Sequence, residues 1–305
     1  MPLSAVRVAY CARHYEEPPQ LTESDSAPTW ITRGVNLVIA VTEARQGTAL
    51  VRTHQPDEYM LILPTSVRAT VYAGSDVITA EGDSLTIVPP GYSKVVLPDG
   101  GRVVRIFTSR AEDLAAAAVN SLNYAASFDS AVEPIKDWPE PIGGFRLRNY
   151  PLGPHEQTSG PRIQPRIFRS TNLMINAFVP WKTRRNPREM SPHWHADFEQ
   201  ASVGMEGSFV HHIRYPWESD MELWHDDQHL LTGSPSVAII PPPAIHTTQD
   251  VGDGAAWLID VFAPPRVDFS SKPGFVLNEA DYPAPADLSD ATGRTGGSLQ
   301  GWQKS

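Results

Sequence analysis

Two histidines stand two residues apart at His193 and His195, and a third, His246, follows a proline-rich segment. On an extended strand, residues two apart point to the same face, so both imidazoles can contact one ion. A third imidazole completes a facial set of nitrogen ligands that suits Fe, Mn, Ni, Zn or Cu. Because an isolated His-x-His also arises by chance, the metal-site prediction depends on the elements around it.

The composition is that of a globular protein rich in turns. The chain has 305 residues, 41% of them hydrophobic, with 29 prolines against 21 glycines. This length allows two domains with separate cores, and frequent turns favour short strands over long helices. We therefore expect an all-β fold.

Charge and cysteine content argue against several classes of protein. The formal net charge is −10 and no block of basic residues occurs, which argues against a nucleic-acid partner. Cys11 is the single cysteine, so no intrachain disulfide can form and a reducing compartment is suitable. There is no apolar run of about 18 residues. We expect a soluble cytoplasmic protein with no membrane partner.

The first half contains seven short apolar or β-branched runs separated by turns, a spacing typical of a sandwich or barrel. These runs are 36–42, 48–53, 59–63, 67–72, 84–88, 94–97 and 103–107. The alanine-rich segment 111–124 follows, with Glu112 and Asp113 in its first turn, and predicts a helix that ends this domain.

A similar series of strands recurs in the second half, and the same order of features implies two copies of one fold. The predicted strands begin near Ile167 and continue at 172–179, 199–205, 208–215, 230–231, 236–240 and 256–262. We divide the chain into an extended arm (1–33), a first domain (34–125), a linker (126–165), a second domain (166–270) and a tail (271–305).

The segments 193–195, 205–207 and 233–246 resemble the two motifs of the cupin superfamily, of which the first reads Gly-x5-His-x-His-x3,4-Glu-x6-Gly. Pro243 and Asp250 depart from the second motif, where the family has glycine and asparagine. The resemblance implies a bicupin, in which two jelly-roll barrels (double-stranded β-helices) with few short helices form one chain.

The same motif leaves the fourth metal ligand open between Gln200 and Glu199. Counting back from Gly207 places Gln200 at the glutamate position, whereas counting forward from His195 with the shorter spacing places Glu199 there. Neighbouring residues on a regular strand face opposite sides, so only one of the two can face the metal. The glycine is the firmer reference and favours Gln200, while carboxylate chemistry favours Glu199.

The first half resembles the same scaffold without its metal ligands. Arg52 and Lys94 stand where the family has its first and last histidines, with His54 and Glu58 between them. We expect the two cations to pair with Glu58 in place of an ion. The resemblance thus implies one divalent metal ion per chain, bound in the second domain.

The strand after Gly207 carries His211, His212 and Arg214, which are candidate catalytic residues. Strand alternation lets only one parity of residues face the barrel interior, and the sequence does not decide which. A histidine facing inward could transfer protons or steady a substrate anion, although a histidine with a purely structural role is as common.

Three histidines without a carboxylate leave positions on the metal for a bidentate substrate and dioxygen. This arrangement resembles the gentisate and salicylate type of cupin dioxygenase and the diketone-cleaving type. We expect an Fe(II) dioxygenase of a small aromatic hydroxy acid or enolisable diketone, with Mn, Ni or Zn as other metals. The alternatives are a non-redox lyase, isomerase or hydrolase using Glu199, and a binding protein without catalysis. The resemblance also implies a homo-oligomer, a dimer or tetramer.

Overall fold

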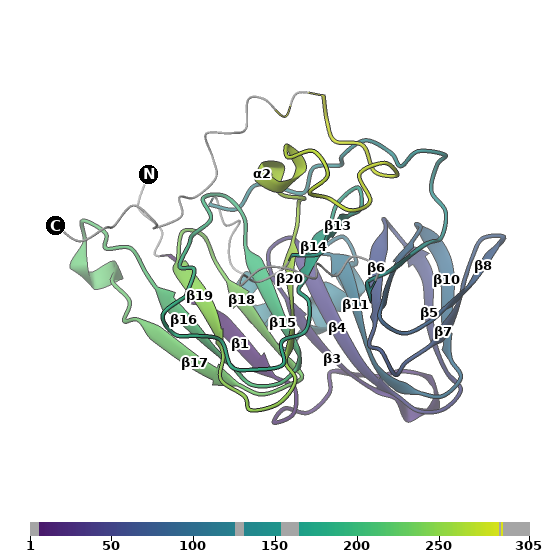
Figure 1. Ribbon diagram of the computed structural model, residues 1–305, viewed down its shortest axis with the longest axis horizontal. Coiled ribbons are helices and arrows are strands. Elements are labelled where there is room, and N and C mark those ends of the chain that lie inside the picture. The colour runs from purple at the N-terminus through teal and green to yellow at the C-terminus, as the bar shows by residue number, and fades with distance from the viewer. Residues whose placement is uncertain (1–5, 126–130, 154–164, 287, 289–305) are drawn as a thin grey trace.

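The chain folds into two β-barrels that lie side by side, as the computed structural model in Figure 1 shows. The structure describes residues 6–125, 131–153, 165–286 and 288. Strands dominate both halves, and in the described part of the chain no helix is long and apolar enough to cross a membrane.

The N-terminal barrel combines a seven-stranded and a four-stranded sheet. The larger sheet has the order β12 (Arg148–Pro151), β9 (Ser84–Val88), β6 (Tyr59–Leu63), β11 (Gly101–Thr108), β4 (Leu37–Ala44), β3 (Pro28–Arg33) and β2 (Leu21–Thr22). The smaller sheet has the order β5 (Thr48–Gln55), β10 (Gly91–Leu97), β7 (Ala69–Ala73) and β8 (Asp76–Ala80).

The C-terminal barrel combines a six-stranded and a three-stranded sheet. The larger sheet has the order β1 (Tyr10–Arg13), β18 (Ser236–Ile240), β15 (Gln200–Glu206), β20 (Trp257–Phe262), β14 (Met174–Ala177) and β13 (Ile167–Arg169). The smaller sheet has the order β17 (Gln228–Thr232), β16 (Phe209–Arg214) and β19 (Ile245–Asp250).

The two larger sheets have matching strand orders, and each receives an edge strand from outside its own half. β1 from the N-terminal segment pairs with β18, and β12 from the segment between the barrels pairs with β9. Figure 1 shows β1, in purple, among the green strands of the C-terminal barrel. Segments expected as an arm and a linker therefore contribute strands, and β3 also begins inside the expected arm.

The larger sheets pack against each other across the boundary between the barrels, which explains why their strands are apolar on both faces. One apolar cluster joins Ile39 and Ile62 of the N-terminal sheet to Ile175, Val203 and Ile259 of the C-terminal sheet. The alternate residues of these strands line the barrel interiors, as Val38 and Leu61 do in the N-terminal barrel. Sheet-on-sheet packing thus fixes β15, the strand that begins with the candidate ligand Gln200.

Helices are shorter than the sequence predicts. The alanine-rich segment forms α1 (Glu112–Ala117) and a 3-10 turn at Ser121–Tyr124, because Ala118 has an extended backbone that ends the helix. The second helix, α2 (Val267–Ser270), follows β20.

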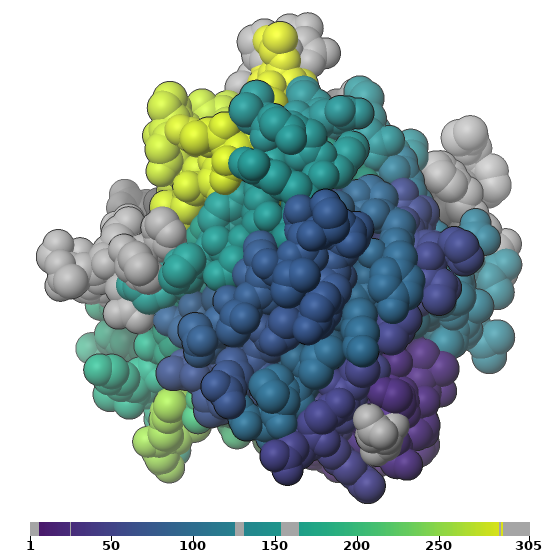
Figure 2. Space-filling view, turned by 90° about the vertical axis from the view of Figure 1, so that its right-hand side faces the viewer, coloured from purple at the N-terminus to yellow at the C-terminus, as the bar shows by residue number. Residues whose placement is uncertain are grey.

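The C-terminal segment is only partly covered by the structure. Residues 271–286 of the expected tail are described and place Tyr282, 1% exposed, against Arg169. In Figure 2 this segment, in yellow, packs against the teal middle of the chain. Of the rest of that tail, only residue 288 lies within the described residues.

The pairing of β1 with the C-terminal barrel predicts an effect of Ala12→Asp. Ala12 is 0% exposed and pairs with Val237, so an uncompensated carboxylate there lowers the free energy of unfolding by about 3 kcal/mol or more. In Ala12→Asp, exchange of the backbone amide hydrogens should become faster in β18 before it does in β9. Ala255→Asp, at an exposed loop position of the same barrel, is the control, with an expected change within about 0.5 kcal/mol. Unchanged protection of β18 in Ala12→Asp would contradict the pairing.

Candidate metal centre

Backbone hydrogen bonds hold two of the three histidines side by side. The His193 N–H donates to the His246 carbonyl at 3.0 Å, and the His246 N–H donates to the His193 carbonyl at 2.8 Å. His246 lies on β19, whereas His193 makes only this isolated bridge and His195 lies outside regular strands. Two residues that exchange both bonds project their side chains to one face of the ladder.

The structure brings His193, His195 and His246 together inside the C-terminal barrel. One nitrogen from each ring lies within 4.8 Å of the others, and the ring centroids are 4.4 to 5.1 Å apart. His195 and His246 are buried and His193 is half-buried. In the described part of the chain this is the one group of three or more histidine, cysteine or acidic side chains with that geometry, so it could hold a metal ion.

The donor set fits a metal because two of the rings are already oriented by the backbone. The Nδ1–H of His193 donates to the Ser191 carbonyl at 2.9 Å, and the Nδ1–H of His246 donates to the Ala244 carbonyl at 3.0 Å. With Nδ1 protonated, the Nε2 atom of each neutral ring carries a lone pair. Histidines that bind metal typically donate their other ring N–H to a carbonyl or carboxylate in this way.

Burial also keeps the imidazoles neutral. Desolvation lowers the pKa of His246 to about 3, and it lowers the pKa of His195 and of His193 as well. The positive charge of Arg266 adds to this effect on all three rings. The nitrogens therefore need no deprotonation before they bind a cation near neutral pH.

Gln200 faces the histidines and Glu199 faces the other barrel. The Oε1 atom of Gln200 lies 3.0 Å from Nε2 of His195 and 3.4 Å from Nε2 of His246. Glu199 instead accepts the backbone N–H of Val35 at 2.5 Å, on the turn between β3 and β4. The alternation of side chains at the start of β15 thus directs the two candidate ligands to opposite sides.

The three candidate catalytic residues divide between the faces of β16. His211 is fully buried on the inner face and pairs with Thr248, two residues beyond His246 on β19. His212 and Arg214 are on the outer face, where they bind His229 and Asp227. This position corrects the expectation for His212 and Arg214, because neither side chain can reach a group held at the histidines.

His211 retains capacity for a further hydrogen bond. Its Nδ1 atom lies 2.9 Å from the Thr248 hydroxyl, and among the described residues its buried Nε2 atom has no hydrogen-bond partner. Burial lowers the pKa of His211 to about 4, so the ring is neutral at pH 7.

Positive charge borders the site. Arg185 hydrogen-bonds to the carbonyls of Thr248 and Glu189 and to the Ser191 hydroxyl, all of which are uncharged acceptors. Arg266 forms an ion pair with Asp268 and lies over the Phe269 ring at 3.6 Å. The positive charges of both arginines lower the pKa of His193. Asp268 and the buried Asp260 offset part of this positive charge, and Arg185, whose hydrogen bonds all go to uncharged acceptors, is the cation best placed to attract an anionic ligand.

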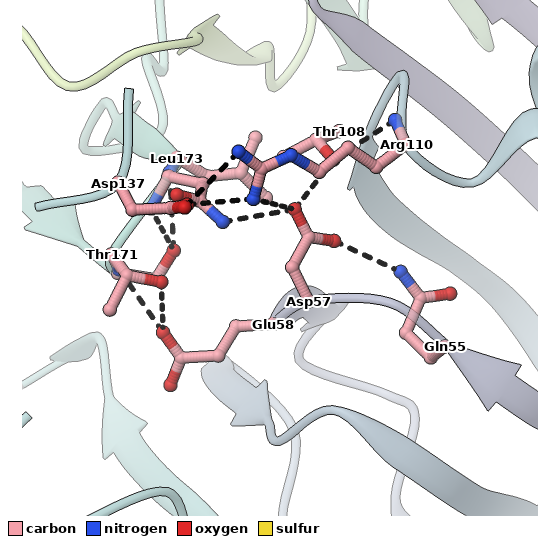
Figure 3. Close-up of polar contacts among 10 residues, drawn as sticks. Gln55, Asp57, Glu58, Thr108, Arg110, Asp137, Thr171 and Leu173 are labelled. Carbon is pink, nitrogen blue, oxygen red and sulfur yellow. Dashed lines mark hydrogen bonds and ion pairs between the residues drawn. The ribbon is translucent and has the colours of Figure 1, made fainter. Parts of the chain in front are cut away.

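The N-terminal barrel does not pair Glu58 with Arg52 and Lys94, so that expectation is wrong. Figure 3 shows Glu58 directed to Thr171, whose N–H and hydroxyl donate to it at 3.1 and 2.9 Å. The Tyr282 hydroxyl donates to its other oxygen at 2.7 Å. Glu58 therefore satisfies its buried charge across the barrel boundary, as Glu199 does from the other side.

Arg52 lies at the mouth of the N-terminal barrel, where both of its terminal nitrogens bind Asp113 of α1, at 2.6 and 2.9 Å. The residue opposite Arg52 on β10 is Ser93, so Lys94 projects from the other face. Inside the barrel, Ser93 and the Tyr59 hydroxyl hydrogen-bond at 3.0 Å. A phenol and a serine thus occupy the level at which the other barrel carries Gln200 and histidine.

Sequence reasoning missed the polar residues behind Gln200. The Gln200 amide donates to the Ser202 hydroxyl at 3.0 Å, and that hydroxyl donates to Asp260 at 2.6 Å. Burial raises the pKa of Asp260 to about 6. The sequence did contain a sign of these residues. Gln200 and Ser202 alternate along one apolar strand and Asp260 interrupts another, and buried polar residues in such positions face a barrel interior and need hydrogen-bond partners.

No family model and no curated protein matches the sequence. Solved structures do match most of the chain. Lactobacillus farciminis oxalate decarboxylase in complex with formate is 11% identical with a TM-score of 0.58, covering 87% of this chain and 88% of that one. A variant of Bacillus subtilis oxalate decarboxylase is 12% identical with a TM-score of 0.56, covering 91% and 84%. AerE from Microcystis aeruginosa is 8% identical with a TM-score of 0.54, covering 82% and 97%.

Identities this low show the fold alone. The chain has a mostly β fold that matches oxalate decarboxylase structures over most of its length, which confirms the prediction of an all-β chain of two barrels with few short helices. These similarities do not show the expected resemblance to gentisate-cleaving enzymes.

The lowered pKa of His246 predicts how the stability of the metal-free protein depends on pH. A histidine in the unfolded chain takes up a proton near pH 6.5, whereas the folded His246 does so only at about pH 3. The unfolded state therefore binds more protons between these values, and the free energy of unfolding falls as pH is lowered. Replacing His246 by Gln should reduce the slope between pH 5 and 6 by about 1 kcal/mol per pH unit.

The slope is measured by urea unfolding in the presence of a chelator. His54→Gln makes the same substitution at an exposed position of β5 and serves as the matched control. Equal slopes for His246→Gln and the unmodified chain would mean that His246 takes up its proton in the folded state.

Proposed function

We propose that the chain is a metal-dependent oxygenase that uses one divalent ion, Fe(II) in the first place, to cleave a small aromatic hydroxy acid or an enolisable diketone. The observation that carries this proposal is a neutral donor set: three imidazoles and the Gln200 amide, with Glu199 turned to the other barrel. A divalent ion in such a set keeps its full charge, so an anionic substrate that binds through two oxygens complements it.

When bound, a redox-active divalent ion supplies open positions at which a bidentate substrate and dioxygen meet. The residues of the chain hold and orient the reactants. The backbone bridge between His193 and His246 fixes the two imidazoles, and the charge of Arg185, next to Ser191, attracts an anionic substrate. The substrate class rests on this charge and on the absence of a carboxylate from the histidine group among the described residues.

His211 is the candidate for proton transfer because it lies on the inner face of β16. Its neutral ring and buried Nε2 atom can accept a proton from, or donate a hydrogen bond to, a substrate hydroxyl bound beside His246. His212 and Arg214 have no part in this proposal.

A non-redox reaction is the second candidate, and the structural similarity to oxalate decarboxylases favours it. One of the matched structures, from Bacillus subtilis, was studied for its Mn(II) centres. By analogy this chain would use Mn(II) to break a carbon–carbon bond of a small carboxylate. Glu199 cannot be the base in that reaction, since it contacts Val35 of the other barrel.

The two candidates differ in oxygen consumption. Metal-free protein is reloaded separately with Fe(II) and Mn(II), then assayed with gentisate, salicylate, a β-diketone and oxalate in an oxygen electrode and for released carbon dioxide. We expect oxygen uptake with Fe(II) that matches substrate loss, and a decrease of about 100-fold or more in His246→Ala. Carbon dioxide release from oxalate by the Mn(II) form, without oxygen uptake, would favour the second candidate.

Variants of β16 and β17 complete this test. His211→Gln should lower kcat while the metal content stays at one ion per chain. His229→Ala removes an exposed histidine of β17 and should leave kcat unchanged. Equal turnover in His211→Gln and the unmodified chain would remove His211 from the mechanism.

A further inference from the structure

We propose that Ser202 and Asp260 are positioning residues that make the amide oxygen of Gln200 the fourth protein ligand of the metal. This inference rests on the metal site of the proposed function and deepens it, but it does not depend on which reaction the site performs.

The three side chains form one continuous chain of hydrogen bonds behind the histidines. Gln200 donates from Nε2 to the Ser202 hydroxyl at 3.0 Å, and Ser202 donates to Asp260 at 2.6 Å. All three are buried, with exposures of 2%, 0% and 8%. They lie on β15 and β20, where Ser202 is the direct partner of Asp260 in the strand register. Regular pairing of two central strands thus fixes the spacing of the chain.

The direction of each hydrogen bond follows from the carboxylate of Asp260, the last group in the series. A carboxylate can only accept hydrogen bonds, so the Ser202 hydroxyl donates its single hydrogen to Asp260. The hydroxyl oxygen is then left with lone pairs, which can receive only a donor, and the amide of Gln200 must present its NH₂ group to it. The carbonyl oxygen of Gln200 is therefore directed toward the histidines.

A second observation is that this oxygen faces a lone pair of His246. The Nδ1–H of His246 is committed to the Ala244 carbonyl, so its Nε2 atom is an acceptor, and it faces the Gln200 oxygen at 3.4 Å. Two acceptors directed at each other are unfavourable unless a cation lies between or beside them. The Gln200 oxygen also lies 3.0 Å from Nε2 of His195, which can donate a hydrogen bond to it in the metal-free protein and has a lone pair for the ion once its proton is on Nδ1. A metal ion satisfies all of these atoms at once.

The N-terminal barrel provides an internal comparison. Tyr59 begins β6 as Gln200 begins β15, and each pairs with the last residue of the neighbouring strand, Val88 or Ile240. Two residues later, Leu61 pairs with Arg105, where Ser202 pairs with Asp260. The barrel without the three histidines therefore also lacks the hydroxyl and the carboxylate.

The test measures metal affinity rather than turnover. Metal-free protein is titrated with Co(II) in competition with a chelator, using the unmodified chain, Gln200→Met, Ser202→Ala and the double variant. Met keeps the approximate volume of Gln without its oxygen. We expect each single variant to weaken binding by about 10- to 100-fold, the usual effect of residues that orient metal ligands. The double variant should bind no more weakly than Gln200→Met, because Ser202 acts through Gln200.

Two controls match these variants in place and chemistry. Ser236→Ala removes a hydroxyl of β18 that is 0% exposed and donates to the Gly233 carbonyl. Glu199→Gln changes the residue beside Gln200 that faces the other barrel. Both should retain the metal affinity of the unmodified chain, even where urea unfolding shows lower stability.

The outcomes separate this inference from the proposed function. Affinity of Ser202→Ala equal to that of Ser236→Ala, or effects of Gln200→Met and Ser202→Ala that multiply in the double variant, would overturn the positioning role alone. An unmodified chain that binds no Co(II), Mn(II) or Fe(II) would overturn the metal site and the proposed function with it.

Discussion

The alternation of side chains at the start of β15 is the constraint on which the site depends. Glu199 and Gln200 are neighbours, so a strand directs them to opposite faces. The carboxylate contacts the backbone of Val35 in the other barrel, and the amide contacts His195 and His246. A shift of one residue would exchange them, placing a negative charge among the histidines and an amide at the barrel boundary. The charge of the site is therefore set by strand register.

The same constraint operates in the N-terminal barrel, which explains its buried acid. Glu58 precedes β6 as Glu199 precedes β15, and it binds Thr171 and Tyr282 across the boundary. Each barrel thus contributes one glutamate to the other, next to the apolar cluster that the two larger sheets share. Because β1 comes from the N-terminal segment and β12 from the segment between the barrels, each larger sheet takes one edge strand from outside its own barrel. The N-terminal barrel has a structural role even without metal ligands.

Much of this arrangement could be predicted from local sequence, because spacing fixes which side chains share a face. The spacing of His193 and His195 pointed to one site, and the resemblance to the cupin motifs added His246 and the count from Gly207 to Gln200. Partners distant in sequence could not be predicted. The parity of β16 depends on its pairing with β19, which placed His211 inside and Arg214 outside. Likewise, only the tertiary fold shows that Glu58 meets Tyr282, and its partner was expected to be a nearby cation.

In the proposed site, one ion binds to a neutral set of three imidazoles and one amide oxygen. Anomalous X-ray diffraction from crystals loaded with Mn(II) or Fe(II) tests it most directly. We expect one anomalous peak per chain, in contact with His193, His195, His246 and the Oε1 atom of Gln200. A peak bound by the carboxylate of Glu199, or a second peak of equal height inside the N-terminal barrel, would contradict it.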